Sequence, residues 1–309
     1  MLKSANSRLL AVFACLLWST AFLGVKIGLR SMPPMLFAGI RFFLAGLAVA
    51  LLYRKPGKLR QIREHWRQLL LVGMFQTFGL YSLFFYSLTL MRASTGAIVN
   101  GVGPLIVAVT AHFTLAGSRL NRRQFFCLIL GAAGVVLVSF AGSSDLLSGA
   151  ASELKAVLIM LAALVFGAMA SVLVAKSPDD LDPFLLNAGQ LMAGGAALLL
   201  TAVLKGDRPY ADIPVQEFSL ALVWLIFVSA AGFSIWYYLL KVRKESLSQM
   251  AVWKFLIPIA GAVISWVFMK DDNPELLSIS GMLLTALSIY LFYHTPATTV
   301  ETEVVREND

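Results

Sequence analysis

Long uninterrupted apolar stretches are the feature of this sequence that most restricts its fold. A bilayer's hydrocarbon core of about 30 Å takes about 20 residues of helix, and ten stretches approach or reach that length. They lie near 9–29, 35–53, 69–91, 95–117, 124–141, 156–175, 183–204, 218–240, 248–269 and 276–293. Helix is expected because lipid offers the backbone no hydrogen-bond partner, and the stretches are too long for the strands of a barrel.

The composition agrees with an all-α polytopic membrane protein. Of the 309 residues, 59% are hydrophobic and only 14% are charged, whereas soluble domains carry about 25% charged residues. Too few polar residues remain to cover a soluble surface, and the disulfide-rich, coiled-coil, collagen-like and disordered classes are excluded too. Cys15 and Cys127 lie inside apolar stretches. We therefore expect no disulfide, no metal site and no cofactor.

The basic residues indicate how the chain is oriented. They lie mostly in short loops between the apolar stretches, so the net charge of +8 is interpreted as a topology signal, and no nucleic-acid partner is expected. If the amino terminus is cytoplasmic, sixteen Lys and Arg residues fall on the inner side and six on the outer side. This positive-inside bias predicts that both termini are cytoplasmic, in the inner membrane of a bacterium. The first stretch lacks a persuasive cleavage site and is expected to remain as a span.

The chain divides into two units, 1–145 and 146–309, at the linker-like loop 142–152. Three segments recur in the same order, and they pair Arg41 with Gln190, "GLYSLFFY" with "GFSIWYYL", and Asn100 with Lys254. Because each unit would hold five spans, the second would be inserted upside down. Inverted repeats around a central cavity are the architecture of alternating-access transporters. The alternative explanation is that low-complexity apolar helices align with one another by composition alone.

Four motifs resemble those of the EamA-type drug/metabolite transporter superfamily. They are "LLWSTAFLGVK" in the first stretch, the P-x6-R pattern of Pro34 and Arg41, "ASTGAIVNGVGPLIVAVTAHFTLAGSRL", and "CLILGAAGVVLVS". The resemblance covers residues 8–293 and implies a ten-helix carrier of small molecules, often an exporter of amino acids and related metabolites. The sequence departs from the family pattern at 117–119 (Gly-Ser-Arg), where members often carry an acidic or neutral residue, so the subfamily stays open.

Ionisable residues within the apolar stretches are candidates for function. The stretches contain no Asp or Glu, one histidine, His112, and three basic residues, Lys26, Arg41 and Lys254. Each charge at a helix centre costs about 2.5–3.5 kcal/mol on insertion scales. Lys254 would lie roughly 10 Å deep, and we interpret it as the counter-charge of a substrate carboxylate. The alternative is a side chain that reaches the interface.

The other ionisable residues allow weaker predictions. Arg41 could hold a carboxylate through both guanidinium nitrogens, or it could cap helix carbonyls. Lys26 lies near the outer end of its stretch and is expected to reach the interface. His112 is expected to be a packed, structural histidine.

Aromatic and uncharged polar residues within the stretches suit a cavity for a small solute with an apolar body. Any single aromatic could instead face lipid. The predicted substrate-binding residues are Trp18, Arg41, Gln76, Tyr81, Asn100, Gln190, Trp236, Trp253 and Lys254. Pro104 and Pro258 each follow a polar residue by four positions and are predicted to act as hinges that free the carbonyls of Asn100 and Lys254. A purely structural bend is the alternative.

These observations predict a secondary transporter that exports or exchanges small metabolites, with amino acids, including hydrophobic and aromatic ones, as the expected substrates. Without a carboxylate in the membrane, we expect facilitated export or exchange. A multidrug exporter of cationic compounds would need buried acids. A membrane-embedded enzyme is disfavoured because the loops carry no Ser/His/Asp constellation, HExxH motif or phosphate-binding glycine motif. The predicted repeat disfavours a channel. The expected partners are a small-molecule substrate and the lipid bilayer, and a monomer is compatible with the sequence.

Overall fold

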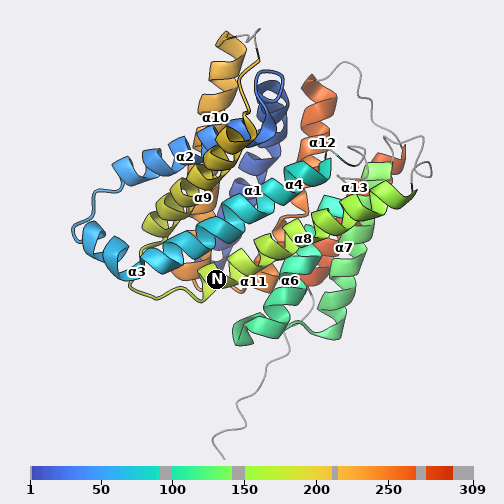
Figure 1. The fold of residues 1–309 in the computed structure, drawn as a ribbon. Helices are drawn as coiled ribbons and strands as arrows, with labels where there is room; N and C mark the ends of the chain where they lie inside the picture. Colours follow the sequence, from blue (N-terminus) through green and yellow to red (C-terminus); the bar gives the residue numbers. More distant parts are fainter. Residues whose placement is uncertain are drawn as a thin grey trace, which may run out of the picture.

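The computed structural model describes residues 2–88, 90, 99–140, 150–210, 215–268 and 276–294, and its regular structure in these ranges is entirely helical (Figure 1). The elements are α1 (Leu2–Gly28), α2 (Pro34–Leu52), α3 (Lys58–Val72), the π-helical segment η1 (Gly73–Gly79), α4 (Leu80–Leu88), α6 (Gly103–Thr114), the 3₁₀ turn η2 (Ala116–Ser118), α7 (Arg122–Phe140), α8 (Ala150–Ala175), α9 (Pro183–Lys205), α10 (Val215–Lys241), α11 (Leu247–Trp253), α12 (Leu256–Phe268) and α13 (Leu276–His294).

Within the described residues, six helical runs are long and apolar enough to cross a membrane. They are Asn6–Val25, Pro34–Leu52, Lys58–Leu88, Leu154–Ala175, Pro183–Lys205 and Val215–Lys241. The other predicted stretches contain α6, α7, the interrupted pair α11 and α12, and α13. The prediction of an all-helical membrane protein is confirmed, whereas the count of ten spans stays a prediction.

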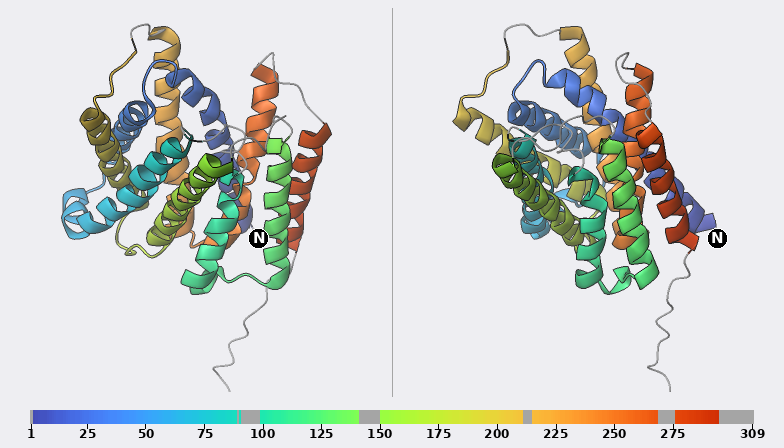
Figure 2. Two further views of the ribbon diagram at one scale, coloured as in Figure 1. Left: turned by 45° about the vertical axis from the view of Figure 1, so that its right-hand side comes forward. Right: turned by 90° about the vertical axis from the view of Figure 1, so that its right-hand side faces the viewer.

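The helices pack in pairs drawn from both halves of the chain. α2 packs along α9 and α7 along α13, and both views in Figure 2 place these two pairs on opposite sides of the bundle. Between them, α1 packs against α10 and α12, whereas α8 packs against α4 and α6. α6 and α11 also pack against each other. The core is therefore built mainly from contacts between the two halves.

The crossing of α2 and α9 depends on two glycines. A Cβ atom at Gly46 would lie 2.7 Å from the backbone nitrogen of Met192, and one at Gly195 would lie 2.6 Å from the backbone nitrogen of Phe43. Both distances are far below van der Waals contact. Small residues at such crossings let two helix backbones approach closely, which is a main source of helix association in lipid.

Candidate functional site

Lys254 lies where the helix breaks between α11 and α12. Its ammonium nitrogen is 4.7 Å from the ring centroid of Trp236 and 5.8 Å from that of Trp18. The two indole rings are themselves 5.3 Å apart. An ammonium over an indole face is attracted by the ring quadrupole. Three residues far apart in sequence, from α1, α10 and the α11–α12 break, thus form one cluster.

Glycine at position 232 allows Trp18 to reach this cluster. A Cβ atom at Gly232 would lie 2.7 Å from Nε1 of Trp18, so any larger residue there would displace the indole ring. Phe233 contacts the other side of the cluster, with its ring centroid 5.4 Å from that of Trp18. The Nε1–H of Trp236 is buried and has no hydrogen-bond partner among the described residues. Buried indole N–H groups usually have a partner, so this donor is an exception in the described structure.

The Lys254 ammonium has no counter-charge in the part of the chain that the structure describes. The ion pairs found there join Lys55 to Asp182, Arg60 to Glu64, His65 to Asp180 and Lys244 to Asp179, all in loops or in α3. Lys254 is also partly exposed, unlike a residue sealed in a core. The arrangement can therefore accept an anionic group while the indole rings contact an apolar one.

Arg41 occupies a different environment on α2. Its side chain is only 5% exposed, and its guanidinium carbon lies 4.3 Å from the ring centroid of Phe42 and 5.6 Å from that of Tyr81. Its Nε atom is buried without a hydrogen-bond partner among the described residues. The structure thus brings the predicted residues Arg41 and Tyr81 together, in an aromatic enclosure.

Gln190 belongs to a buried polar network that joins η1, α9 and α10. Thr77 donates to its Oε1 at 2.6 Å, and its Nε2 donates to Oδ1 of Asn187 at 3.0 Å. Asn187 in turn donates to Oγ of Ser234 at 2.9 Å. Protein groups therefore engage both ends of the Gln190 amide.

The remaining predicted site residues lie apart from one another. Trp253 stacks on Tyr293 of α13, with ring centroids 4.8 Å apart, so it contributes to the packing of α11 on α13. Gln76 is half-buried in η1, and Asn100 is half-buried in the helical turn that precedes α6. The structure places no two of these three residues in a common cluster.

The two predicted hinge prolines both lie in the first turn of a helix. Pro104 is the second residue of α6 and Pro258 the third residue of α12, and each helix follows an interruption. A proline is tolerated there because its missing N–H needs no intrahelical acceptor. The prediction that the Lys254 carbonyl is free is wrong, because it accepts a hydrogen bond from the backbone N–H of Ile257 at 3.1 Å.

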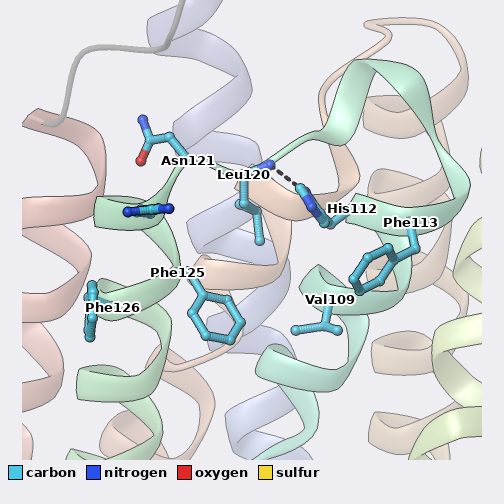
Figure 3. Close-up of a pocket in the computed structure, with 8 residues that line it drawn as sticks. Val109, His112, Phe113, Leu120, Asn121, Phe125 and Phe126 are labelled. Carbon is cyan, nitrogen blue, oxygen red and sulfur yellow. Dashed lines mark hydrogen bonds between the residues drawn. The ribbon is translucent and has the colours of Figure 1, made fainter.

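A hollow of about 500 Å³ lies between α6 and α7, away from the Lys254 cluster (Figure 3). Its lining includes Phe113, which is 80% exposed, and Phe126, which is 69% exposed, so it opens on the outer surface of the bundle. Nδ1 of His112 accepts a hydrogen bond from the backbone N–H of Leu120 at 2.8 Å. This contact joins the end of α6 to the loop before α7, as expected of a structural histidine.

Sequence reasoning missed Phe233 and Thr77 as parts of these clusters. Phe233 adjoins Gly232, and the spacing of Gly232 and Trp236 puts them on one face of a helix. That spacing was the available signal. Thr77 carried none, because its partner Gln190 lies 113 positions away.

The long apolar helices and the family to which the chain belongs make it a multi-pass membrane transporter. The chain belongs to the EamA-like transporter family, whose model matches residues 7–140 and again residues 154–294.

Relatives of known sequence and structure share nearly the whole chain. The uncharacterized transporter YoaV of Bacillus subtilis (strain 168) is 23% identical and aligns over 89% of this chain and 92% of its own length. The uncharacterized inner membrane transporter YedA of Escherichia coli (strain K12) is 24% identical, covering 96% and 95%. A probable amino-acid metabolite efflux pump of Salmonella typhimurium is 24% identical, covering 93% and 95%. A protein of known crystal structure has the same fold, with a TM-score of 0.78, 22% identity and coverage of 93% and 96%.

Proposed function

We propose that this protein is a secondary carrier that exports or exchanges small carboxylate-bearing metabolites, chiefly amino acids with hydrophobic or aromatic side chains. One observation carries the proposal: the ammonium of the half-buried residue Lys254 lies over Trp18 and Trp236 and has no carboxylate partner among the described residues. A charge so placed in a membrane protein is expensive and is usually functional. An anionic guest would supply the missing counter-charge.

The cluster offers both kinds of contact that such an amino acid needs. Its carboxylate would accept hydrogen bonds from Lys254, and its side chain would pack beside Trp18 and Phe233. A hydrogen bond to a charged group contributes about 1.5–3 kcal/mol, which corresponds to roughly tenfold to hundredfold in affinity. The relative from Salmonella is named as a probable amino-acid metabolite efflux pump, which agrees with this substrate class.

The alternative functions fit the cluster less well. A cationic drug would meet an ammonium that already occupies the indole faces and would be repelled by it. An enzyme would need several catalytic polar groups beside Lys254, and among the described residues the titratable group that interacts with it is the buried thiol of Cys15. The predicted spans contain no Asp or Glu, so we propose export or exchange down a gradient without a proton-carrying carboxylate.

The packing supports two inverted units, 1–145 and 146–309, as the frame of this carrier. The family model matches two segments, so each helix of the first segment has a counterpart in the second. When every helix is replaced by its counterpart, the contacts of α1 with α10 and α12 become the contacts of α8 with α4 and α6. The pairs α2–α9, α6–α11 and α7–α13 exchange with themselves. A two-fold axis in the membrane plane produces such a pattern, and it relates the halves of alternating-access carriers. We infer ten spans with both termini in the cytoplasm, as the basic loops predict.

Close contacts at paired glycines follow the same exchange. Gly46 on α2 meets the backbone of Met192 on α9, and Gly195 on α9 meets the backbone of Phe43 on α2. Trp18 on α1 fills the space at Gly232, and Phe166 on α8 fills the space at Gly79, where a Cβ atom would lie 2.4 Å from its ring. The second aromatic is a Phe without a cation nearby in the described structure. The two halves have thus diverged at the position where the substrate is proposed to bind.

Counterflow in proteoliposomes tests the proposal. Vesicles loaded with unlabelled phenylalanine should take up radiolabelled phenylalanine saturably, and phenylalaninamide, which lacks the carboxylate, should not compete. Lys254→Gln should raise the half-saturating concentration at least tenfold, Lys254→Arg should retain part of the activity, and Lys155→Gln, an exposed lysine on α8, should behave as the parent. Equal transport by the parent and by folded Lys254→Gln would remove Lys254 from the site. Uptake of a cationic dye in place of phenylalanine would support the drug-exporter alternative.

A further inference from the structure

The helical run that contains α3 is longer than the membrane core requires. Lys58–Leu88 comprises 31 residues, which at 1.5 Å per residue span about 46 Å, whereas the hydrocarbon core is about 30 Å thick. Roughly ten residues must therefore lie outside the hydrocarbon. All the charged residues of the run lie within Lys58–Arg67. This end is the part that lies among the headgroups.

The segment Lys58–Arg67 carries an apolar row beside a basic row. Leu59, Ile62 and Trp66 are 74%, 39% and 52% exposed. Leu59 and Ile62, three positions apart, share one face of the helix before the break at His65, and Trp66 follows that break. Arg60, Arg63 and Arg67 repeat the same spacing one position later and are also exposed. We call these six residues the basic–apolar face.

The rest of the segment is attached to the α8–α9 loop. Gln61 accepts a hydrogen bond from the backbone N–H of Asp182 at 3.1 Å, and the His65 ring bonds Asp180 at 2.8 Å. α3 lies at the edge of the bundle in Figure 1 and in the left view of Figure 2. The helix departs from regular dihedral angles at His65 (φ −114°, ψ 17°), so Lys58–Glu64 is turned relative to the part of α3 that begins at Trp66. The segment is thus fixed to the protein on one side and open on the other.

We propose that the basic–apolar face lies in the plane of the membrane surface and binds anionic phospholipid headgroups. Leu59, Ile62 and Trp66 enter the boundary with the acyl chains, and the arginines contact lipid phosphates. This is the arrangement of interfacial amphipathic helices. Charge complementarity selects the anionic lipid: Glu64 pairs with Arg60 at 2.8 Å, whereas Arg63 and Arg67 have no carboxylate partner in the described residues.

The proposal has a mechanical consequence for the α8–α9 loop. That loop is held on its other side by Lys241 at the end of α10, which donates to Oγ of Ser177 at 2.7 Å and to the carbonyl of Pro178 at 2.6 Å. Lipid that holds Lys58–Arg67 at the surface therefore also holds the loop between α3 and α10. Anionic lipid should raise the melting temperature as well as bind locally.

Lipid-specific quenching in nanodiscs tests the proposal on the full chain. A fluorescent probe at Leu59→Cys reports its lipid neighbours, and labelling is selective because Cys15 is 0% and Cys127 7% exposed. In discs of equal phosphatidylglycerol and phosphatidylcholine, each lipid is brominated in turn. We expect stronger quenching by the brominated phosphatidylglycerol. The ratio of quenching by brominated phosphatidylglycerol to quenching by brominated phosphatidylcholine should fall in R60Q, R63Q and R67Q. We expect a fall of up to about fivefold for each arginine removed, because a basic residue near an anionic surface contributes about that factor to binding.

A charge-matched control separates local binding from net charge. The triple variant K155Q/K205Q/R208Q removes three exposed charges elsewhere and should keep the parent ratio and the parent rise in melting temperature with phosphatidylglycerol. If R60Q/R63Q/R67Q does not fold, adding salt to the parent should lower the ratio, since exposed charges are screened within about 3 Å at 1 M salt. A ratio of one in the parent, or a ratio that neither salt nor R63Q changes, would overturn the proposal. The proposal would also be overturned if neither brominated lipid quenched the probe.

Discussion

Leucine at the glycines of the α2–α9 crossing is predicted to separate these helices. A Cβ atom at Gly46 would lie 2.7 Å from the backbone nitrogen of Met192, and one at Gly195 would lie 2.6 Å from the backbone nitrogen of Phe43. The obstacles are backbone atoms, which cannot rotate away as a side chain can. Ordinary van der Waals contact begins at 3.4 Å, so the helices must move apart by on the order of 1 Å, which forfeits a quarter to a half of the dispersion energy of their contacts.

The magnitude follows from the cost of forced expansion. Overpacking a well-packed core costs about 1–3 kcal/mol, occasionally more, and replacing glycine in a helix returns up to about 1 kcal/mol. Leucine adds three carbons beyond Cβ. We therefore expect each single variant, Gly46→Leu or Gly195→Leu, to have a free energy of unfolding about 2 kcal/mol below that of the parent. One separation relieves both clashes. The double variant should therefore lose less than the sum, by about 1 kcal/mol, as coupled neighbours do.

Unfolding of the purified protein in mixed micelles, followed by circular dichroism, measures these losses. Ala196→Leu is the matched control, because Ala196 adjoins Gly195 on the exposed side of α9, and it should unfold as the parent does. If the losses of the two single variants added exactly in the double variant, the idea that one helix separation relieves both clashes would be refuted. Single variants as stable as Ala196→Leu would refute it too.

Three further predictions follow from the side-chain contacts. Gln190→Leu removes two buried hydrogen bonds and should destabilise the protein by about 1–2 kcal/mol in the same unfolding assay, since each such bond contributes about 0.6 kcal/mol in a membrane and at most about 1.7. Trp236→Leu should weaken phenylalanine binding in a thermal-shift assay, whereas Trp253→Leu, which loses only packing on α13, should lower the melting temperature without changing the affinity. The hydrogen bond from Lys244 holds the pKa of Asp179 below its ordinary value. That stabilisation is present above about pH 4 and is lost as the pH falls through the lowered pKa of Asp179. Hydrogen exchange of the α8–α9 loop, corrected for its intrinsic pH dependence, should therefore accelerate only when the pH falls below about 4.

The sequence was sufficient for the helical class because a membrane leaves few alternatives to helix for long apolar stretches. It was less informative about where helices begin. The third stretch was predicted to start at residue 69, whereas the helix begins at Lys58. A search for apolar stretches misses Lys58–Arg67 because its charged residues lower the mean hydropathy, although Leu59, Ile62 and Trp66 already had helical spacing.

Side-chain direction limited the prediction of the site. Trp253 and Lys254 are neighbours in sequence, but successive residues on a helix point about 100° apart, and the helix also breaks at this point. Lys254 lies over Trp18 and Trp236, whereas Trp253 stacks on Tyr293. Composition could place both residues in one span, but only the packing of α1, α10 and α13 around them decides which faces the cluster.

The sequence was equally unable to show which groups surround the two basic residues predicted to lie deep in the membrane, Arg41 and Lys254. From the sequence, Lys254 was interpreted as the counter-charge of a substrate carboxylate, whereas Arg41 was left open between binding a carboxylate and capping helix carbonyls. Arg41 is 5% exposed, with Phe42 and Tyr81 against its guanidinium, whereas Lys254 stays partly exposed. A planar, weakly hydrated guanidinium tolerates aromatic enclosure, but a compact, strongly hydrated ammonium needs hydrogen-bond acceptors. The guanidinium of Arg41 contacts the rings of its own enclosure, whereas the Lys254 ammonium contacts two indole rings and has no carboxylate partner among the described residues. Under the proposed function, Lys254 is therefore the cation that we expect to bind the substrate carboxylate.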